Sequence, residues 1–443
     1  MSKMLSECLK VIHQSCTEER IIERITNDSR LCDEKTLYCG EKYQKDALDR
    51  HAYIVEGKYL GELLRFFYGD LSSHYFVIGI TGTSGKTSLS YLLIDVLKAM
   101  GHRCIRLGSG QNDFMDESRE NKNTTMSLED NIKVFQDHIG KCDVIIMEVS
   151  SHAIDQNRIA FIQFDRLFYT NILLDHLDYH LTFSHYKATK LKLIHYLKKE
   201  GKILMHYDHR LLHEIFCHTR NVISYGKKGK FCVSAMCSGF EGSSIQIKDI
   251  FFVTHLLGEH QMMNLLGVLA MLEDMNVDLN EVKEIVSHLH NREGRMEHFL
   301  VLKRHIVIDY AHTPDALMEV CNFLRKQCDK KLICVMGCGG NRDRKKRPLM
   351  MEIAAFFCDV VIVTEDNNRD EDFDLIIEEM KAEKYENVEV EEKREIAVER
   401  AFNLSNERDI ILLAGKGNEK FLIAKGVKTP YNDKACILKY ERG

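Results

Sequence analysis

Residues 75–100 read YFVIGITGTSGKTSLSYLLIDVLKAM. The apolar run 75–80 predicts a buried β-strand, and the apolar residues of 87–100 recur at the spacing of one helical face. A turn rich in Gly and Thr joins the two segments. Backbone N–H groups in such a turn, together with the N-terminus of the following helix, favour phosphate oxygens. The stretch therefore predicts a nucleotide-binding loop at the end of a sheet strand.

The loop itself reads ITGTSGKTS over residues 80–88. Lys86 is expected to reach the β- and γ-phosphates, and the Thr87 hydroxyl to contact Mg²⁺. Ile80 stands where the usual G-x-x-x-x-G-K spacing has its first glycine, and Gly79 lies one residue early. A chance Gly/Ser turn is the alternative interpretation, and the loop does not by itself say where the phosphoryl group goes. The expected nucleotide contacts from the loop are Thr81, Gly82, Thr83, Ser84, Gly85, Lys86, Thr87 and Ser88.

Length and composition exclude several classes of protein. The chain has 443 residues, which predicts two to four domains at roughly 150 residues each. A net charge of −6 supplies no basic footprint for nucleic acid. The 15 cysteines include no C-x-x-C pair and are interpreted as reduced thiols of a cytoplasmic protein. The N-terminal segment lacks a signal-peptide core, and no apolar run reaches the roughly 18 residues of a membrane span.

Strands and helices alternate along most of the chain, which is typical of a parallel sheet wrapped by helices. Residues 143–149 and 165–169 predict further buried strands of the first series. A second series follows the loop 291–298, with helices expected at 316–327 and 349–357. Its expected strands are 305–310, 331–337, 359–366 and 409–417.

These patterns predict an α/β protein of three domains. Residues 1–74 are expected to form a small mixed α/β domain of their own. Residues 75–293 are expected to form a central ATPase domain with the phosphate loop on a parallel sheet, and residues 294–443 a C-terminal Rossmann-like α/β domain.

Beyond the loop, a set of motifs resembles the Mur ligase family, and within it the members that add the third amino acid of the bacterial cell-wall peptide. The motifs, in the family's order, are MEVSSHAIDQNRI (147–159), TNILLDHLDYH (170–180), HYKATK (185–190), GRME (294–297), DYAHTPDAL (309–317), GCGGNRDRKKRPLM (337–350), DNNR (366–369) and GKGNE (415–419). The resemblance implies a substrate-binding N-terminal domain, a central ATPase domain and a C-terminal domain that closes over the site. It also implies that ATP, with Mg²⁺, converts a carboxylate into an acyl phosphate, which an amine attacks to give an amide, ADP and phosphate.

The resemblance assigns the catalytic set Lys86, Glu148, His176 and Lys190, with Thr87, Glu148, His176 and Lys190 at the metal. Glu148 ends a predicted strand, where a hard oxygen ligand for Mg²⁺ belongs. Lys190 occupies the position of the family's carbamylated lysine, which is an anion rather than a cation. The alternatives are a helix-capping role for Glu148, a structural hydrogen-bonding role for His176 and a solvated Lys190.

The resemblance also assigns residues to the rest of the nucleotide. Asn264 is similar to the family's adenine-side asparagine, although Gln261 replaces the asparagine that precedes it. Arg295, Asp309 and His312 are expected to approach the nucleotide when the domains close. Hydrogen bonding at loop ends is the alternative role for these three.

The motif DNNR at 366–369 resembles the D-N-P-R of members that add meso-diaminopimelate, with Asn368 in the place of proline. A guanidinium pairs bidentately with a carboxylate, which suits the second carboxylate of diaminopimelate and has no partner in lysine. Glu419 is expected to bind the distal ammonium, and Asn418 replaces the family's histidine. The expected amino-acid pocket is Arg342, Asp366, Asn367, Arg369, Gly415 and Glu419.

The acceptor implied by the resemblance is UDP-N-acetylmuramoyl-L-alanyl-D-glutamate. Its expected contacts are Ser29, Arg30, Asn123, Thr124, Thr125, Ser150 and Arg158. The N-terminal domain is shortened, Met126 replaces a proline, and Leu173-Leu174 replaces a polar-Arg pair. A relative that joins L-lysine or another amine to a different carboxylate therefore stays open. A non-catalytic relative is disfavoured by the complete phosphate and metal set. The expected partners are small molecules alone, without nucleic acid or membrane insertion, and the expected state is a monomer.

Overall fold

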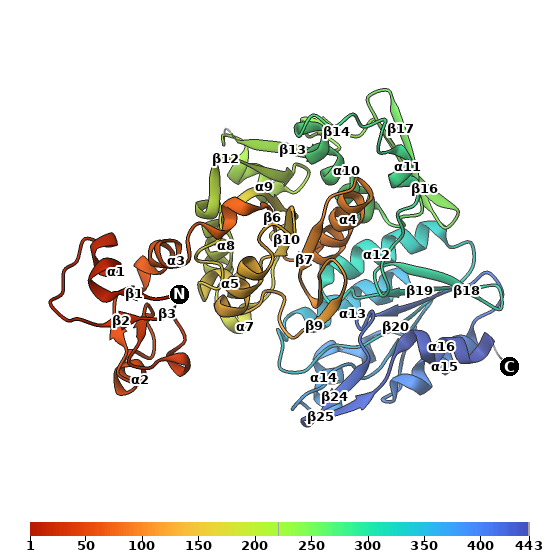
Figure 1. Cartoon of the computed structure of the whole chain (residues 1–443). Helices are drawn as coiled ribbons and strands as arrows, with labels where there is room; N and C mark the ends of the chain where they lie inside the picture. The colour runs from red at the N-terminus through yellow and green to blue at the C-terminus, as the bar shows by residue number, and fades with distance from the viewer. Residues whose placement is uncertain (220, 442–443) are drawn as a thin grey trace.

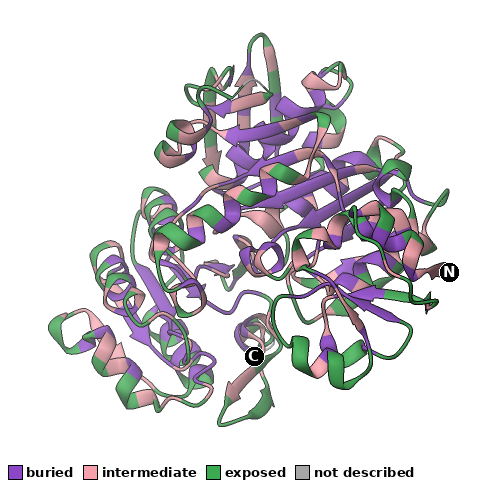
Figure 2. Ribbon diagram, turned by 90° about the vertical axis from the view of Figure 1, so that its left-hand side faces the viewer, coloured by how far each residue is buried: buried purple, intermediate pink, exposed green. Residues whose placement is uncertain are grey.

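Three sheets follow one another along the chain and carry the fold (Figure 1). The computed structural model describes residues 1–219 and 221–441. A small three-stranded sheet lies near the N-terminus, a nine-stranded sheet in the middle and a six-stranded sheet toward the C-terminus. The buried residues concentrate along the two larger sheets, while the outer faces of the surrounding helices are exposed (Figure 2). This is the α/β architecture that the sequence predicts.

The N-terminal sheet is parallel and is covered by helices that have one apolar face. In α3 the buried residues Leu60, Leu63, Leu64 and Phe67 recur at the period of one helical face, which packs on α1 and β3. The elements are β1 (Lys3–Met4), α1 (Leu5–Val11), β2 (Ile21–Ile22), β3 (Arg24–Thr26), the 3₁₀ helix η1 (Ser29–Leu31), β4 (Thr36–Tyr38), α2 (Gln44–Asp49), β5 (Tyr53–Ile54), η2 (Gly57–Tyr59), α3 (Leu60–Tyr68) and η3 (Leu71–His74).

The nine-stranded sheet has the order β14-β13-β12-β11-β6-β10-β7-β8-β9. It is parallel from β14 to β7, and β8 and β9 close it as an antiparallel hairpin. The phosphate-loop strand β6 is central in this sheet, so its carboxyl end opens onto the edge where ligands of such sheets bind. The strands are β6 (Phe76–Thr81), β7 (Cys104–Leu107), β8 (Gly110–Asp113), β9 (Ser118–Asn121), β10 (Val144–Glu148), β11 (Phe164–Tyr169), β12 (Leu197–His206), β13 (Val222–Gly226) and β14 (Phe231–Cys232).

Helices cover both faces of this sheet. On one face, α4 and α10 pack on the strands, and twelve consecutive residues of α10, 261–272, are buried. On the other face, α5, α8 and α9 share a cluster with the N-terminal helices α1 and α3. The helices are α4 (Lys86–Ala99), α5 (Leu128–Asp137), α6 (Ser151–Asp155), α7 (Leu177–His180), α8 (Phe183–Leu191), η4 (Lys192–Tyr196), α9 (Arg210–Phe216), α10 (Glu259–Asp274) and α11 (Lys283–Ser287). An antiparallel sheet of β15 (Ala235–Gly239), β16 (Gly242–Ile247) and β17 (Ile250–Thr254) precedes α10.

The six-stranded sheet has the order β18-β19-β23-β20-β21-β22 and is parallel except for β18. Alternate residues of β20 face opposite clusters: Leu332 and Cys334 pack with α12, α13 and α14, whereas Ile333 and Val335 pack with α15 and α16. The elements are β18 (Glu297–Val301), β19 (Arg304–Asp309), α12 (Pro314–Gln327), β20 (Leu332–Met336), α13 (Lys346–Phe357), β21 (Val360–Val363), α14 (Phe373–Met380), η5 (Ala382–Lys384), β22 (Val388–Val390), α15 (Arg394–Leu404), β23 (Ile410–Ala414), β24 (Phe421–Ala424), β25 (Val427–Pro430), α16 (Asp433–Ile437) and η6 (Leu438–Glu441).

The predicted strands and helices of both series are confirmed, and the expected strands 359–366 and 409–417 each end three residues earlier than predicted. β21 ends at Val363 and β23 at Ala414, so that Asp366 and Gly415 lie in the loops beyond them. In these loops Asp366 Oδ1 accepts a hydrogen bond from the Asn367 N–H, and Gly415 adopts a φ of +101°, which glycine tolerates because it has no Cβ. The domain limits at 74/75 and 293/294 stay predictions. Over the described residues, none of the helices combines the length and the apolar character needed to cross a bilayer.

Candidate active site

The phosphate loop lies between the end of β6 at Thr81 and the start of α4 at Lys86. Gly85 caps α4 at a φ of +83°, a conformation that glycine adopts without the steric cost of a Cβ. The Asn171 side chain follows β11 and accepts hydrogen bonds from the N–H groups of Thr83 (3.0 Å) and Ser84 (2.9 Å). The Asn171 side chain therefore fixes the backbone conformation of the turn that the sequence predicts.

Two lysines converge on one carbonyl of this loop. Lys86 Nζ donates to the Gly82 carbonyl (2.7 Å) and the Thr83 carbonyl (3.0 Å), and Lys190 Nζ donates to Gly82 (2.9 Å). Lys190 is only 1% exposed, so its interpretation as a solvated surface lysine is wrong. Burial lowers the pKa of Lys86, and burial together with the nearby Lys86 holds the pKa of Lys190 well below its usual range.

The Glu148 carboxylate lies under the loop at the end of β10 and is fully buried. Its Oε2 accepts from Thr87 Oγ1 at 3.0 Å, and its Oε1 accepts from Ser90 Oγ at 3.1 Å. Two neighbouring oxygen ligands of an octahedral Mg²⁺, each about 2.1 Å from the ion, lie about 3.0 Å apart. The spacing of Thr87 Oγ1 and Glu148 Oε2 therefore fits one edge of a magnesium site.

His176 precedes α7 in a left-handed conformation, and its ring lies 5.2 Å from that of His152. Burial holds the pKa of His176 below its usual range. The imidazole is therefore neutral at pH 7 and keeps a lone pair for a metal ion.

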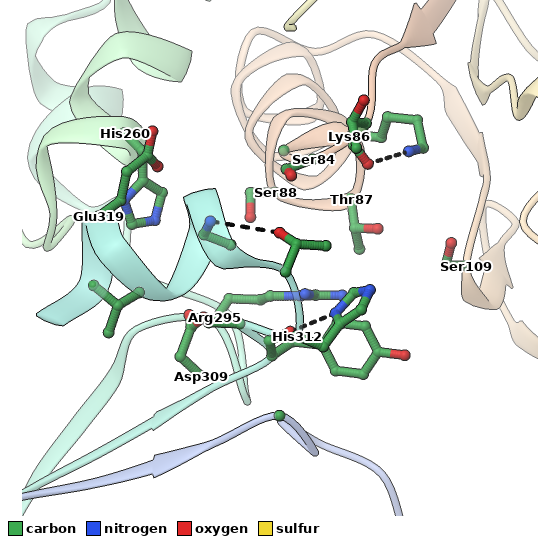
Figure 3. A pocket seen from close by; sticks show the side chains of 18 of the residues that line it. Ser84, Lys86, Thr87, Ser88, Ser109, His260, Arg295, Asp309, His312 and Glu319 are labelled. Atoms are coloured by element: carbon green, nitrogen blue, oxygen red, sulfur yellow. Dashed lines mark hydrogen bonds between the residues drawn. The ribbon is translucent and has the colours of Figure 1, made fainter. Parts of the chain in front are cut away.

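A cavity of about 1560 Å³ extends from the phosphate loop to the six-stranded sheet. Most of the predicted site residues line this cavity, some from the nine-stranded sheet and its loops and others from the six-stranded sheet and its loops. Figure 3 shows Lys86 and Thr87 on one side and Arg295, Asp309 and His312 on the other. The predicted residues that line the cavity are Thr83, Ser84, Gly85, Lys86, Thr87, Ser88, Asn123, Thr124, His176, Asn264, Arg295, Asp309, His312, Arg342, Asp366, Asn367, Arg369, Gly415 and Glu419.

The predicted nucleotide residues beyond the loop lie along this cavity. Asn264 on α10 contacts Gln261 (3.5 Å), which in turn donates to Ser88 (3.3 Å). The Arg295 guanidinium lies over the Tyr310 ring, 4.3 Å from its centre. Asp309 accepts from the Met296 N–H at 2.7 Å, and burial raises its pKa. His312 Nδ1 lies 2.7 Å from the Tyr310 carbonyl oxygen.

The predicted amino-acid residues form one polar cluster at the C-terminal end of the cavity. Asn367 Nδ2 donates to Glu419 Oε2 at 2.8 Å, and Arg369 Nη1 donates to the Gly340 carbonyl at 2.6 Å. Arg342 reaches across the cavity to Asp178 on α7, at 3.9 Å. These contacts bring together side chains from four separate motifs, at 170–180, 337–350, 366–369 and 415–419.

Lys416, at the centre of this cluster, is not among the predicted site residues. Lys416 is fully buried, and its Nζ lies 2.9 Å from Glu419 Oε2, 3.4 Å from Asp366 Oδ1 and 3.3 Å from Asn367 Oδ1. Its position inside GKGNE, directly after an apolar strand, is the signal that could have indicated it. The Tyr310 hydroxyl, 3.3 Å from Glu419, was also missed.

Several predicted residues do not line the cavity. Thr81 ends β6 and Gly82 begins the loop, while Glu148 and Lys190 lie beneath it. The Thr125 hydroxyl donates to the Glu148 backbone carbonyl at 2.9 Å. The Thr125 backbone carbonyl accepts a hydrogen bond from Arg158 Nη1 at 2.8 Å. Ser150 caps α6 and lies 3.4 Å from the Thr125 hydroxyl.

Ser29 and Arg30 are the predicted acceptor contacts of the N-terminal part, and they lie in η1. Ser29 is buried, whereas the Arg30 side chain is 83% exposed and pairs with Asp28 at 2.6 Å. The nearby Asn27 donates to the Gln156 carbonyl at 2.9 Å. This contact places η1 beside the segment that carries Arg158.

Fold and site together define a phosphate-loop nucleotide-binding enzyme whose cavity carries a polar cluster at the end opposite the loop. Two family models match the chain: the Mur ligase middle domain over residues 80–272 and the glutamate ligase domain of Mur ligases over residues 294–417. The UDP-N-acetylmuramoyl-L-alanyl-D-glutamate–2,6-diaminopimelate ligase of Aquifex aeolicus is 35% identical over 91% of this chain and 88% of its own length. The chain belongs to the Mur ligase family.

Solved structures agree with this fold. The structure of a UDP-N-acetylmuramoyl-L-alanyl-D-glutamate–2,6-diaminopimelate ligase has a TM-score of 0.68 at 24% identity and covers 100% of this chain and 99% of that chain. A MurF ligase from Thermotoga maritima in complex with ADP has a TM-score of 0.64 at 16% identity, over 94% of this chain and 96% of that chain. These likenesses confirm the Mur ligase fold.

Proposed function

We propose that the protein is an ATP-dependent ligase that joins meso-diaminopimelate to UDP-N-acetylmuramoyl-L-alanyl-D-glutamate in peptidoglycan precursor synthesis. The observation that carries the proposal is the shared cavity, in which the phosphate loop faces the cluster of Asp366, Asn367, Arg369 and Glu419. The relative from Aquifex aeolicus has the same activity in its name. We place the reaction in the cytoplasm, on a monomeric enzyme.

The chemistry needs a carboxylate to become an electrophile. A carboxylate has no good leaving group, so the γ-phosphoryl group of ATP is transferred to one of its oxygens and ADP leaves. The amine nitrogen then attacks the acyl carbon, the C–O bond to phosphate breaks, and the nitrogen loses a proton. The cavity brings the three reactants close together, which supplies much of the rate enhancement.

Each residue has a role in this scheme. The loop N–H groups and Lys86 bind the phosphates of ATP, and Asn264, Arg295, Asp309 and His312 line the cavity toward the rest of the nucleotide. Thr87, Glu148 and His176 would hold Mg²⁺, which neutralises the crowded phosphate charge when bound. The acceptor contacts are Ser29, Arg30, Asn123, Thr124, Thr125, Ser150 and Arg158.

Lys190 is proposed to become carbamylated. The lowered pKa of Lys190 favours the neutral amine, the form that attacks CO₂; a bond forms between Nζ and the carbon, and Nζ loses a proton. The resulting carbamate is an anion with two oxygens beside the loop, suited to orienting the cation at Glu148. The expected result after chemical trapping of the carbamate is a mass increase on Lys190 that equals one CO₂ plus the trapping group, and an unmodified Lys190 under the same conditions rejects this role.

The pocket chemistry favours an amino acid with a second carboxylate and a second ammonium. Arg369 offers a guanidinium to the carboxylate, and Glu419 offers an anion to the ammonium. One observation favours a second candidate: Asn368 occupies the turn position where a proline is expected, so the amine could be L-lysine or another amine, and the acceptor a different carboxylate.

Release of ADP from ATP, measured with a panel of acceptors and amines, tests the proposal. We expect release only when UDP-N-acetylmuramoyl-L-alanyl-D-glutamate and diaminopimelate are both present. Oxygen-18 in the acceptor carboxylate should pass into the released phosphate. Turnover with another amine in place of diaminopimelate supports the second candidate, and the absence of oxygen-18 transfer rejects the acyl-phosphate route.

A further inference from the structure

A buried arginine lies behind the Glu148 carboxylate and is not part of the proposed chemistry. Arg106 on β7 is fully buried. Its Nε donates to Asp113 Oδ2 (2.7 Å), its Nη1 to Glu148 Oε1 (3.0 Å) and its Nη2 to the Gln111 carbonyl (3.0 Å). The guanidinium also lies over the Tyr91 ring, 3.7 Å from its centre. The planar fork of arginine can make these contacts at once, whereas an ammonium cannot.

The guanidinium determines which oxygen of Glu148 faces the phosphate loop. Oε1 is held by Arg106 and by Ser90, which leaves Oε2 directed toward Thr87 (3.0 Å) and Ser109 (3.2 Å). A buried ion pair contributes little net stability, because the desolvation of both charges offsets their attraction. The arrangement is therefore better explained by orientation of the carboxylate than by stabilisation of the fold.

The same guanidinium anchors the hairpin that leads to the predicted acceptor contacts. Asp113 and Gln111 belong to β8, and the chain continues through β9 to residues 123–125. Ser109 Oγ contacts both Thr124 Oγ1 (3.0 Å) and Glu148 Oε2 (3.2 Å). Arg106 thus links the carboxylate beneath the nucleotide to the segment beside the acceptor.

Gly108 completes the arrangement. A Cβ at this position would lie 2.2 Å from Glu148 Oε1 and 2.3 Å from Arg106 Nη1, closer than atoms can approach. The backbone at Gly108 therefore packs directly against the ion pair, and only glycine leaves room for both side chains.

We propose that Arg106 is a positioning residue for the magnesium–nucleotide site, which holds Glu148 with Oε2 turned toward Thr87 and connects that carboxylate to the β8–β9 hairpin. The inference rests on the nucleotide-binding half of the proposed function alone. Residues that orient a metal ligand typically contribute 10- to 100-fold to metal affinity.

The test is a Mg²⁺ titration of the full chain with ADP, without acceptor or amine. Arg106→Lys keeps the positive charge and removes the fork, so it isolates orientation from charge. We expect Mg²⁺ affinity to fall roughly 10- to 100-fold, while ADP affinity in excess EDTA changes less than about twofold. Arg103→Lys is the matched control, because Arg103 precedes the same strand and forms an exposed pair with Asp143.

Asp113→Asn provides a second variant that leaves Arg106 in place. It should weaken Mg²⁺ binding in the same direction, because the guanidinium loses one anchor. The proposal is overturned if folded Arg106→Lys binds Mg²⁺ with unchanged affinity. If Arg106→Lys does not fold, unchanged Mg²⁺ affinity in Asp113→Asn overturns it instead. If Mg²⁺ affinity falls in Arg106→Lys but not in Asp113→Asn, the role of Arg106 at Glu148 is supported and its connection to the β8–β9 hairpin is rejected. The Mg²⁺ titration contains no acceptor or amine, so its result does not depend on whether the proposed ligase substrates are correct.

Discussion

Replacement of Arg369 by alanine tests the amino-acid pocket directly. The hydrogen bonds of this guanidinium to described residues are made by Nη1, to the Gly340 and Asn367 carbonyls (2.6 and 3.3 Å). Nε and Nη2 are therefore available for a ligand carboxylate. Each hydrogen bond between charged partners contributes about 1.5–3 kcal/mol, and 1.4 kcal/mol corresponds to a tenfold change. Because Arg369 is only half-buried, we take the lower bound, so the KM for diaminopimelate should rise roughly 100-fold.

Steady-state ADP release gives the KM of each substrate in turn. The KM for ATP should change less than about threefold, because the phosphate loop lies at the other end of the cavity. With lysine as the amine, Arg369→Ala should have little effect, because lysine has no distal carboxylate. Arg344→Ala is the control: this side chain pairs with Glu379 at 2.9 Å and does not line the cavity.

The outcome that would refute this reasoning is an equal rise in the KM values for ATP and diaminopimelate. An equal rise in KM with lysine as the amine would also show that Arg369 does not pair with the distal carboxylate of diaminopimelate, because lysine lacks that group.

Three further predictions concern the loop, the C-terminal part and pH. Lys86→Ala should lower turnover at least about 1000-fold with an unchanged circular dichroism spectrum; substantial residual turnover would contradict its phosphate role. Asp433→Asn leaves the buried Arg394 unpaired (2.9 Å in the wild type), so it should destabilise the protein by about 3 kcal/mol in denaturant unfolding; an unchanged midpoint would contradict this. Burial lowers the pKa of His180 and of His298 to about 4, so the folded state binds fewer protons than the unfolded state between pH 6.5 and 4. The thermal midpoint should therefore fall as pH drops through that window, and a flat profile would contradict the shift.

Local sequence was sufficient to predict the strand, loop and helix around Lys86. Strand burial and helical period are properties of neighbouring residues, and both appear within 75–100. The same holds for the second series of strands and for the α/β class. The antiparallel β15–β17 sheet was not predicted, because β15 and β16 include serines and glycines that weaken the alternating pattern.

The missed residues are those whose partners are distant in the chain. Arg106 is 42 positions from Glu148, and Lys416 is 50 positions from Asp366, so neither contact leaves a periodic trace. A charged residue within an apolar strand, as in CIRL at 104–107, indicates a buried partner without naming it. The identity of that partner depends on the order of strands in the sheet.

The hydrogen bonds of Lys86 to the Gly82 and Thr83 carbonyls affect how tightly the loop can hold a nucleotide. A free lysine side chain loses up to about 2 kcal/mol of rotamer entropy when it is immobilised. Here most of that loss occurs on folding, before any ligand arrives. On binding, a phosphate therefore meets an ammonium that is already ordered, and the lysine adds to affinity with little of the usual entropic penalty.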